Sequence, residues 1–466
     1  MVFKNNFAIP VVIILSVIVI LFAVSFVPAE TEILGYQLKE FNLLSDFTEA
    51  PEENSSNENQ SGKSEPVTIK AAIMPEFSVM LADGNNSASL IKSIDDLIKT
   101  QKITGNTDQL KYFFEALKQA DSSVVRIAHI GDSIIEGDYI SSEAREILQK
   151  KFGGSGVGYQ ALTAVDVQFR ITSEHTFSDD WNTYSLFGKK SKKYKYSLNG
   201  EVYIPSKGSS VSYKMRNLPK EISGFNSVKI LYYENDNSDV KITANGKTDD
   251  LKLSAGSGLL ESVYKSGQSA DEVGLKFDPS ASTQIAAVYL EPEKGIQLDN
   301  YPYRGNTGSA MDELSEESLA ELNKYMDYRL IILQFGLNAV AMRKSEFENF
   351  KKDFIKGVKK LKTAFPETSF ILMGVSDKSR KKGSSFVTDP LIIDLIKIQK
   401  EISEETGIAF WNTFEAMGGA NSMVKWVKNK PAYAHSDFTH FNKDGADKIG
   451  EMFANALIDG YIEYTK

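Results

Sequence analysis

A serine placed at the end of a buried strand could act as a nucleophile in this chain. Ser133 lies in Gly131-Asp132-Ser133, directly after the apolar run Val124–Ile130. Active sites of open α/β sheets lie at the carboxyl ends of strands, where backbone N–H groups can stabilise developing charge. The same three residues are also good turn formers, so the motif alone leaves both interpretations open.

A serine nucleophile needs a base, and the C-terminal part of the chain offers one. In Ala434-His435-Ser436-Asp437-Phe438-Thr439-His440, Asp437 and His440 are three residues apart. At this spacing the carboxylate can hold the imidazole Nδ1–H, which leaves Nε2 free to take a proton from Ser133. The alternative is a polar loop before the last helix. His129, inside the apolar strand, is most simply a packed core residue.

Two further segments could stabilise an oxyanion. Asn338 ends the segment Phe335-Gly336-Leu337-Asn338, again after an apolar strand, and its side-chain amide can donate a hydrogen bond. Gly308 lies in Arg304-Gly305-Asn306-Thr307-Gly308-Ser309, where a glycine lets the backbone approach a ligand and offer its N–H. Each segment taken alone is equally typical of an ordinary turn.

The order of these elements along the chain resembles that of the SGNH/GDSL hydrolases, an esterase superfamily with a flavodoxin-like, three-layer α/β fold. The resemblance spans about 124–165 and 296–466. It implies that Ser133, Asp437 and His440 form the catalytic triad and that Ser133, Gly308 and Asn338 form the oxyanion hole. Ala339 departs from the pattern, because many members of the family have an acidic residue after the asparagine.

The layout also resembles that of the peptidoglycan O-acetylesterases, and the segment Phe410–Gly419 is similar to theirs. This resemblance implies a serine esterase that removes O-acyl groups, O-acetyl in particular, from an envelope carbohydrate such as peptidoglycan. An acetylated carbohydrate polymer would be the partner, and no metal or organic cofactor is needed. The alternatives are an O-acetyltransferase with the same triad and a catalytically inert glycan-binding protein.

The surrounding elements fit an α/β domain in two parts, 71–165 and 296–466. Apolar strands at Val124–Ile130, Leu330–Phe335 and Ser369–Met373 alternate with helical patterns, which predicts a parallel sheet covered on both faces. Residues 166–295 instead show short runs of period two. Asn199-Gly200 and Asn245-Gly246 between these runs predict hairpin turns, and the block predicts an inserted β-sandwich or jelly roll.

The N-terminal part predicts export of everything that follows it. Residues 7–27 carry no charge and are long enough to span a bilayer, with residues 1–6 as a cytoplasmic stub and 28–70 as a disordered linker. A cleaved signal peptide is the alternative to this single-pass membrane anchor. In both cases the catalytic part is extracytoplasmic, in the periplasm or at the cell surface.

The composition narrows the possible functions further. A formal net charge of −9 argues against a nucleic-acid partner, because phosphate contacts need a basic surface. With no Cys, the chain cannot have a thiol nucleophile, a disulfide or a Cys-based metal site.

Overall fold

The computed structural model describes residues 32–33, 36–37, 101–164 and 169–466. The predicted stub, the predicted membrane segment at 7–27 and most of the predicted linker lie outside the described residues. Among those that are described, no helix combines the length and the apolar character needed to cross a membrane. The chain divides into two units, and the described part of the first, residues 1–84, is an antiparallel pair of β1 (Glu32–Ile33) and β2 (Tyr36–Gln37).

A mostly parallel sheet forms the centre of the α/β part of the second unit. Its spatial order is β16 (Gly295–Pro302), β4 (Val124–Gly131), β17 (Tyr328–Gln334), β18 (Ser369–Met373), β21 (Ala409–Trp411) and β3 (Thr104–Gly105). The first five strands are parallel, and β3 pairs antiparallel at the edge. Numbered by chain position, the parallel strands lie in the order 2-1-3-4-5, which is the flavodoxin-like arrangement that the family resemblance implied.

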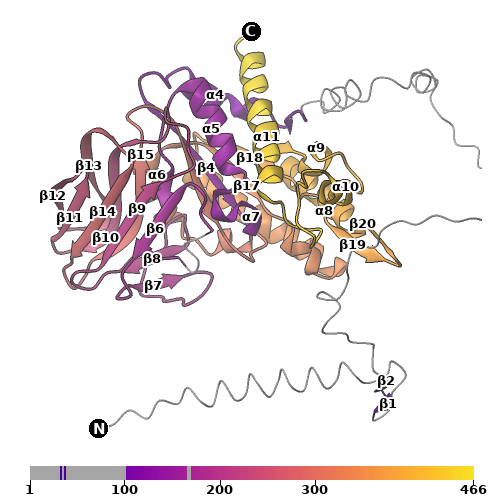
Figure 1. Cartoon of the computed structure of the whole chain (residues 1–466), viewed down its shortest axis with the longest axis horizontal. Coiled ribbons are helices and arrows are strands. Elements are labelled where there is room, and N and C mark those ends of the chain that lie inside the picture. Colours follow the sequence, from indigo (N-terminus) through magenta and orange to yellow (C-terminus); the bar gives the residue numbers. More distant parts are fainter. Residues whose placement is uncertain (1–31, 34–35, 38–100, 165–168) are drawn as a thin grey trace, which may run out of the picture. The chain divides into compact units, whose positions relative to one another are not determined.

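Helices cover both faces of this sheet, and they fall into two groups that pack among themselves (Figure 1). One group contains α4 (Lys111–Leu117), α5 (Ser141–Phe152) and α11 (Lys443–Tyr464). The other contains α6 (Glu316–Met326), α7 (Phe347–Ala364) and α8 (Pro390–Thr406). Right-handed crossovers place the two groups on opposite faces, because the chain moves in opposite directions along the sheet before and after β16. The strands are therefore buried on both sides, as all five residues of β18 are.

Short elements connect the larger ones at the two ends of the sheet. They are η2 (Asp108–Leu110), η3 (Ser133–Asp138), η4 (Ser309–Asp312), η5 (Asn338–Ala341), η6 (Lys344–Glu346), α9 (Thr413–Ala416), α10 (Ser422–Lys428) and a hairpin of β19 (Ser379–Lys382) and β20 (Ser385–Thr388). Three of them, η3, η4 and η5, carry or border the residues that the sequence analysis selected.

Between α5 and β16 the chain forms a β-sandwich. One sheet has the order β13 (Gly256–Ala270), β10 (Phe225–Asn235), β15 (Gln284–Glu291), β8 (Glu201–Ile204) and β7 (Asn182–Ser185). The other has the order β12 (Lys247–Leu253), β11 (Ser238–Ala244), β14 (Glu272–Asp278), β9 (Ser210–Met215) and β6 (Ser173–Phe177). A separate apolar core fills the space between the two sheets.

Two details of this region differ from the sequence prediction. β5 (Gly158–Gln160) pairs with β15, so a segment that we expected in the first part of the α/β domain joins the sandwich instead. Asn199-Gly200 is not a tight hairpin turn, because it precedes β8 at the end of a long connection from β7. Asn245-Gly246 does form the two-residue turn between β11 and β12, with φ of 52° and 72°.

The sandwich is packed against the α/β part rather than tethered to it. Along β10 and β15, Leu231, Tyr233, Ala287 and Tyr289 belong to the core that includes the parallel sheet. The residues that alternate with them, such as Ile230 and Val288, face the core of the sandwich. The central strands β10 and β15 of this sheet are thus buried on both faces, and the two parts share an apolar interface.

Candidate active site

Ser133 lies at the topological switch point of the parallel sheet. β4 ends at Gly131 beside β17, and Ser133 is the first residue of η3. Gly131 is required there, because a Cβ would lie 2.8 Å from the carbonyl oxygen of Gln334. Asp132 caps η3 by accepting a hydrogen bond from the N–H of Ile134 at 3.0 Å. The serine is therefore held where ligands bind in open α/β sheets.

The buried carboxyl of Asp132 ties together the ends of the two central strands. Burial raises the pKa of Asp132 to about 6, and the backbone N–H groups of Ile134, Gly336 and Leu337 partly oppose that effect. The N–H of Asp132 also donates to the carbonyl oxygen of Gln334 at 3.1 Å. Asp132 therefore fixes the position of the neighbouring Ser133 relative to the loop that follows β17.

Asp437 and His440 meet in the loop before α11, as their spacing predicted. Oδ2 of Asp437 lies 2.7 Å from Nδ1 of His440. Oδ1 accepts the backbone N–H groups of Thr439 at 2.9 Å and of His440 at 3.0 Å. Partial burial raises the pKa of Asp437, but these hydrogen bonds outweigh it and leave the pKa below its usual value. The carboxylate is thus ionised and oriented toward the imidazole at neutral pH.

The imidazole of His440 acts on the residue next to the serine. Its charge lowers the pKa of Asp132, which precedes Ser133, and so opposes part of the effect of burial. Within the described part of the chain, Ser133 Oγ and His440 Nε2 are not hydrogen-bonded to each other. Such catalytic contacts often form fully only when a substrate is bound. The side chain of His440 is 45% exposed, so solvent and substrate can reach it.

A hairpin that the sequence analysis missed supports the Asp437–His440 loop. Phe386 on β20 stacks on Phe438, with ring centroids 3.8 Å apart and planes 8° from parallel. The N–H of Ser379 on β19 donates to the carbonyl oxygen of Phe438 at 3.0 Å. Phe438 itself has a φ of 54°, a conformation that is uncommon for an aromatic residue. The hairpin therefore holds the loop in a conformation that it would rarely adopt unaided.

Asn338 lies at the start of η5, at the end of β17, as expected. Its Nδ2 donates to the carbonyl oxygen of Asn306 at 3.1 Å. This hydrogen bond uses one of the two amide hydrogens and links η5 to the glycine-containing loop before η4. The second hydrogen can still be donated to a substrate oxygen.

The backbone N–H of Gly308, which we expected to be available to an oxyanion, already has a hydrogen-bond partner. Its N–H donates to Oδ1 of Asn306 at 2.7 Å. Its φ is 100°, and a Cβ at this position would lie 2.6 Å from the ring of Phe354 on α7. Gly305, in the same loop, donates its N–H to none of the described residues and would leave a Cβ in open space. Sequence spacing could not distinguish these two glycines, because both lie in one loop of the same motif.

The other histidines do not form a second catalytic pair. His129 is buried, with Nε2 3.0 Å from Oε1 of Gln334 and Nδ1 2.9 Å from Oγ of Ser141. Burial lowers the pKa of His129 to about 4, so the ring is neutral. His129 is the core residue that the sequence predicted. In the part of the chain that the structure describes, no group of three or more acidic or histidine side chains is arranged to hold a metal ion.

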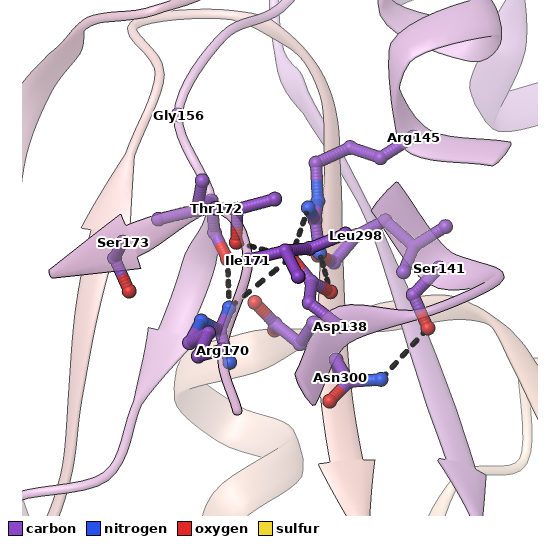
Figure 2. Close-up of polar contacts among 12 residues, drawn as sticks. Asp138, Ser141, Arg145, Gly156, Arg170, Ile171, Thr172, Ser173, Leu298 and Asn300 are labelled. Atoms are coloured by element: carbon purple, nitrogen blue, oxygen red, sulfur yellow. Dashed lines mark hydrogen bonds and ion pairs between the residues drawn. The ribbon is translucent and has the colours of Figure 1, made fainter. Parts of the chain in front are cut away.

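A buried ion pair anchors the segment that begins with Ser133 (Figure 2). Asp138, at the end of η3, accepts two hydrogen bonds from Arg145 on α5, at 2.7 and 2.8 Å. Thr172, in the inserted region, donates to the same carboxylate at 2.5 Å, and Arg170 lies 3.6 Å from it. Arg145 also donates to the carbonyl oxygen of Leu298 on β16 at 2.8 Å. The insert therefore helps to position the loop of the nucleophile.

Comparison with known proteins supports the fold. No family model matches the sequence, and no curated protein matches it. A solved peptidoglycan O-acetylesterase matches with a TM-score of 0.64 and 19% identity, over 78% of this chain and 99% of that one. This share is more than the α/β part alone could supply, so the likeness extends into the sandwich.

Two other solved structures are more distant. A family two carbohydrate esterase from Cellvibrio japonicus has a TM-score of 0.25 and 9% identity, over 62% of this chain and 98% of that one. An acetyl xylan esterase has a TM-score of 0.26 and 15% identity, over 34% of this chain and 81% of that one. At these TM-scores neither structure adds to the argument.

Proposed function

From the SGNH/GDSL hydrolase fold of this chain, we propose that it is a serine esterase that removes O-acetyl groups from an envelope carbohydrate such as peptidoglycan. The observation that carries the proposal is the hydrogen bond between Asp437 and His440, an imidazole that also interacts with the carboxyl of Asp132, the residue before Ser133. The solved peptidoglycan O-acetylesterase, which shares the fold over most of this chain, supports the choice of substrate class. Membrane anchoring through residues 7–27 and an extracytoplasmic site belong to the same proposal.

In the first half of the reaction, Ser133 Oγ attacks the acetyl carbonyl carbon while Nε2 of His440 takes the hydroxyl proton. Asp437 keeps the proton of Nδ1 in place and stabilises the imidazolium that forms. When the tetrahedral intermediate collapses, the ester C–O bond breaks. The sugar oxygen then leaves with the proton from His440.

In the second half, a water molecule attacks the acetyl-enzyme, and His440 takes a proton from this water. Collapse of the second intermediate releases acetic acid and returns the proton to Ser133. A half-exposed His440 gives water access to this step.

The oxyanion of both intermediates would accept hydrogen bonds from the N–H of Ser133 and from Nδ2 of Asn338. Each such donor typically contributes about 3–4 kcal/mol to the transition state. Gly308 stays a candidate for the third donor only if its N–H leaves Asn306 when substrate binds. Gly305 is the alternative, because its N–H needs no such rearrangement.

Two measurements on the full chain test this proposal. A fluorophosphonate probe should label Ser133, and Ser133→Ala should abolish the labelling. Acetate release from O-acetylated peptidoglycan should fall by at least about a thousandfold in Ser133→Ala and in His440→Ala. Near-normal acetate release in Ser133→Ala would refute the mechanism. Sugar oligomers without O-acetyl groups, added as acceptors, would reveal a transferase, because acetate release would then be replaced by a newly acetylated oligomer.

A further inference from the structure

A cavity of about 860 Å³ lies between the rim of the α/β part and the sandwich. Glu136, Asn300 and Arg304 line it from the α/β side, and Phe169, Trp181 and Thr183 line it from the insert. Its volume is within the range of ligand-binding sites in proteins. Neither Ser133 nor His440 lines this cavity, so it is separate from the reaction centre.

The cavity nevertheless opens next to the reaction centre. Glu136 lies three residues after Ser133 in η3, so their Cα atoms are at most about 11 Å apart. Arg304 lies directly before Gly305, at the start of the loop that Asn338 contacts. One polymer chain could therefore occupy the cavity and the reaction centre at Ser133 at the same time.

Two polar residues with buried side-chain atoms, Asn300 and Arg170, support the wall of the cavity. The side chain of Asn300 is fully buried, and its Nδ2 donates to Ser141 Oγ at 2.8 Å and to the carbonyl oxygen of Ile135 at 3.0 Å (Figure 2). Its Oδ1 accepts no hydrogen bond from any described residue. Nε of Arg170, also on the wall, has no acceptor among them either. Both atoms are sealed from the cavity by their neighbours, so recognition of a ligand falls to the exposed groups on the wall.

The polar and aromatic residues of the wall define the chemistry of a ligand. The hydroxyl of Thr183 and the guanidinium of Arg304 line the cavity and can exchange hydrogen bonds with hydroxyl groups of a ligand. Aromatic side chains line the same space, and Phe169 remains 43% exposed there. The guanidinium of Arg304 lies 5.6 Å from the centre of the ring of Phe169 at the entrance. A ring with an apolar face and hydroxyl groups at its edge, which is a pyranose, matches this lining.

We propose that the cavity is a sugar-binding subsite, which holds a pyranose ring of the polymer next to the ring that carries the ester. The guanidinium of Arg304 donates a hydrogen bond to a hydroxyl of that ring, and Phe169 packs against its apolar face. The inference rests on the proposed function, because it takes the polymer to be the acetylated glycan. The new element is a binding site for a neighbouring sugar ring that does not react.

Phe169→Ala tests the subsite, because an exposed aromatic residue can be truncated without opening the core. The Michaelis constant for O-acetylated peptidoglycan should rise at least tenfold, with hydrolysis of p-nitrophenyl acetate unchanged within twofold. Val263→Ala is the matched control, since Val263 is an exposed apolar residue of the same insert that does not line the cavity. It should change neither value. An unchanged Michaelis constant in Phe169→Ala, or an equal loss on both substrates, would overturn the proposal.

A binding measurement separates this proposal from the proposed activity. Soluble glycan strands of peptidoglycan from which O-acetyl groups have been removed should bind the wild-type chain in calorimetry, and at least tenfold more weakly the Phe169→Ala variant. This result would support the subsite even if Ser133→Ala retained esterase activity. If the wild-type chain bound no such strands, or if both chains bound them equally, the subsite would be refuted while the esterase remained testable through Ser133.

Discussion

Replacing Asp437 with Asn removes one contact of the proposed triad and leaves the loop around it intact. The Asn side-chain oxygen can still accept the N–H groups of Thr439 and His440, which lie 2.9 and 3.0 Å from Oδ1 in the wild type. The Asn amide nitrogen then takes the place of Oδ2, 2.7 Å from Nδ1 of His440. Two donors cannot share this contact, so the imidazole must carry its proton on Nε2, where it cannot act as a base toward Ser133.

The size of the effect follows from that contact. A hydrogen bond to a charged partner contributes about 1.5–3 kcal/mol, which corresponds to a loss of about 10- to 160-fold in rate. The opposed donor adds to this loss. However, the side chains of Asp437 and His440 are 47% and 45% exposed, so water can replace part of the contact. We therefore expect Asp437→Asn to lower kcat for p-nitrophenyl acetate by about a hundred- to a thousandfold.

The assay needs evidence that the variant is folded and reports on the base alone. Melting temperatures of the two proteins should agree within about 2 °C, since the backbone hydrogen bonds of the loop remain. Fluorophosphonate labelling of Ser133 should slow in parallel with kcat, because both reactions need a base. A loss smaller than tenfold in a folded variant would refute the role of Asp437. So would a normal labelling rate with a low kcat.

Three further predictions concern stability, pH and the supporting hairpin. Gly308→Ala should lower the free energy of unfolding in urea by about 2–4 kcal/mol, because a positive φ and a close aromatic ring both disfavour the methyl group. The control Gly383→Ala, at a positive φ in open space, should lower it by only about 1 kcal/mol. Equal losses in the two variants would contradict this reasoning. Burial lowers the pKa of His129 from 6.5 to about 4. Between these pH values His129 binds a proton in the unfolded chain but not in the folded chain. The free energy of unfolding should therefore decrease as the pH falls from about 6.5 to 4, by up to about 3 kcal/mol. Urea titrations at several pH values should give a flatter dependence for His129→Gln, and parallel curves would show that this histidine does not contribute. Phe386→Ala should reduce kcat/KM for p-nitrophenyl acetate about tenfold, since a small displacement of the catalytic base slows the reaction. Phe386→Tyr keeps the aromatic stack and should retain the wild-type value. An unchanged kcat/KM in Phe386→Ala would show that the stack does not position the loop.

The parallel sheet could be predicted from the sequence because its strands are continuous apolar runs between clear helical patterns. Ser369–Met373 was predicted with the bounds that the structure shows, and β4 was one residue longer than predicted. Ser133 and Asn338 follow the ends of these strands, so the pattern of burial predicted where both residues lie in the fold, while their catalytic roles stay a proposal. The pairing of Asp437 with His440 followed from local spacing, which a single turn of backbone preserves.

Other features depend on contacts between distant segments, and local patterns did not show them. The β19–β20 hairpin has a polar sequence, Arg380-Lys381-Lys382-Gly383, without apolar alternation, and it is specified by its contact with Phe438. β5 belongs to the sandwich because β15 pairs with it across more than a hundred residues of chain. The partner of the Gly308 N–H is a side chain two residues earlier, and motif spacing gives no information about such a bond.

The sheet that contains β10 and β15 has a consequence for how this chain folds. Since one face of that sheet completes the α/β core and the other closes the sandwich, neither part can lose its structure without exposing apolar surface of the other. The two parts should therefore unfold as one cooperative unit. Strand β16 must also pair with β4 after the whole insert has been synthesised, which makes the central pairing a contact of high sequence separation. Folding of the catalytic sheet should accordingly be slow and should depend on prior ordering of the insert.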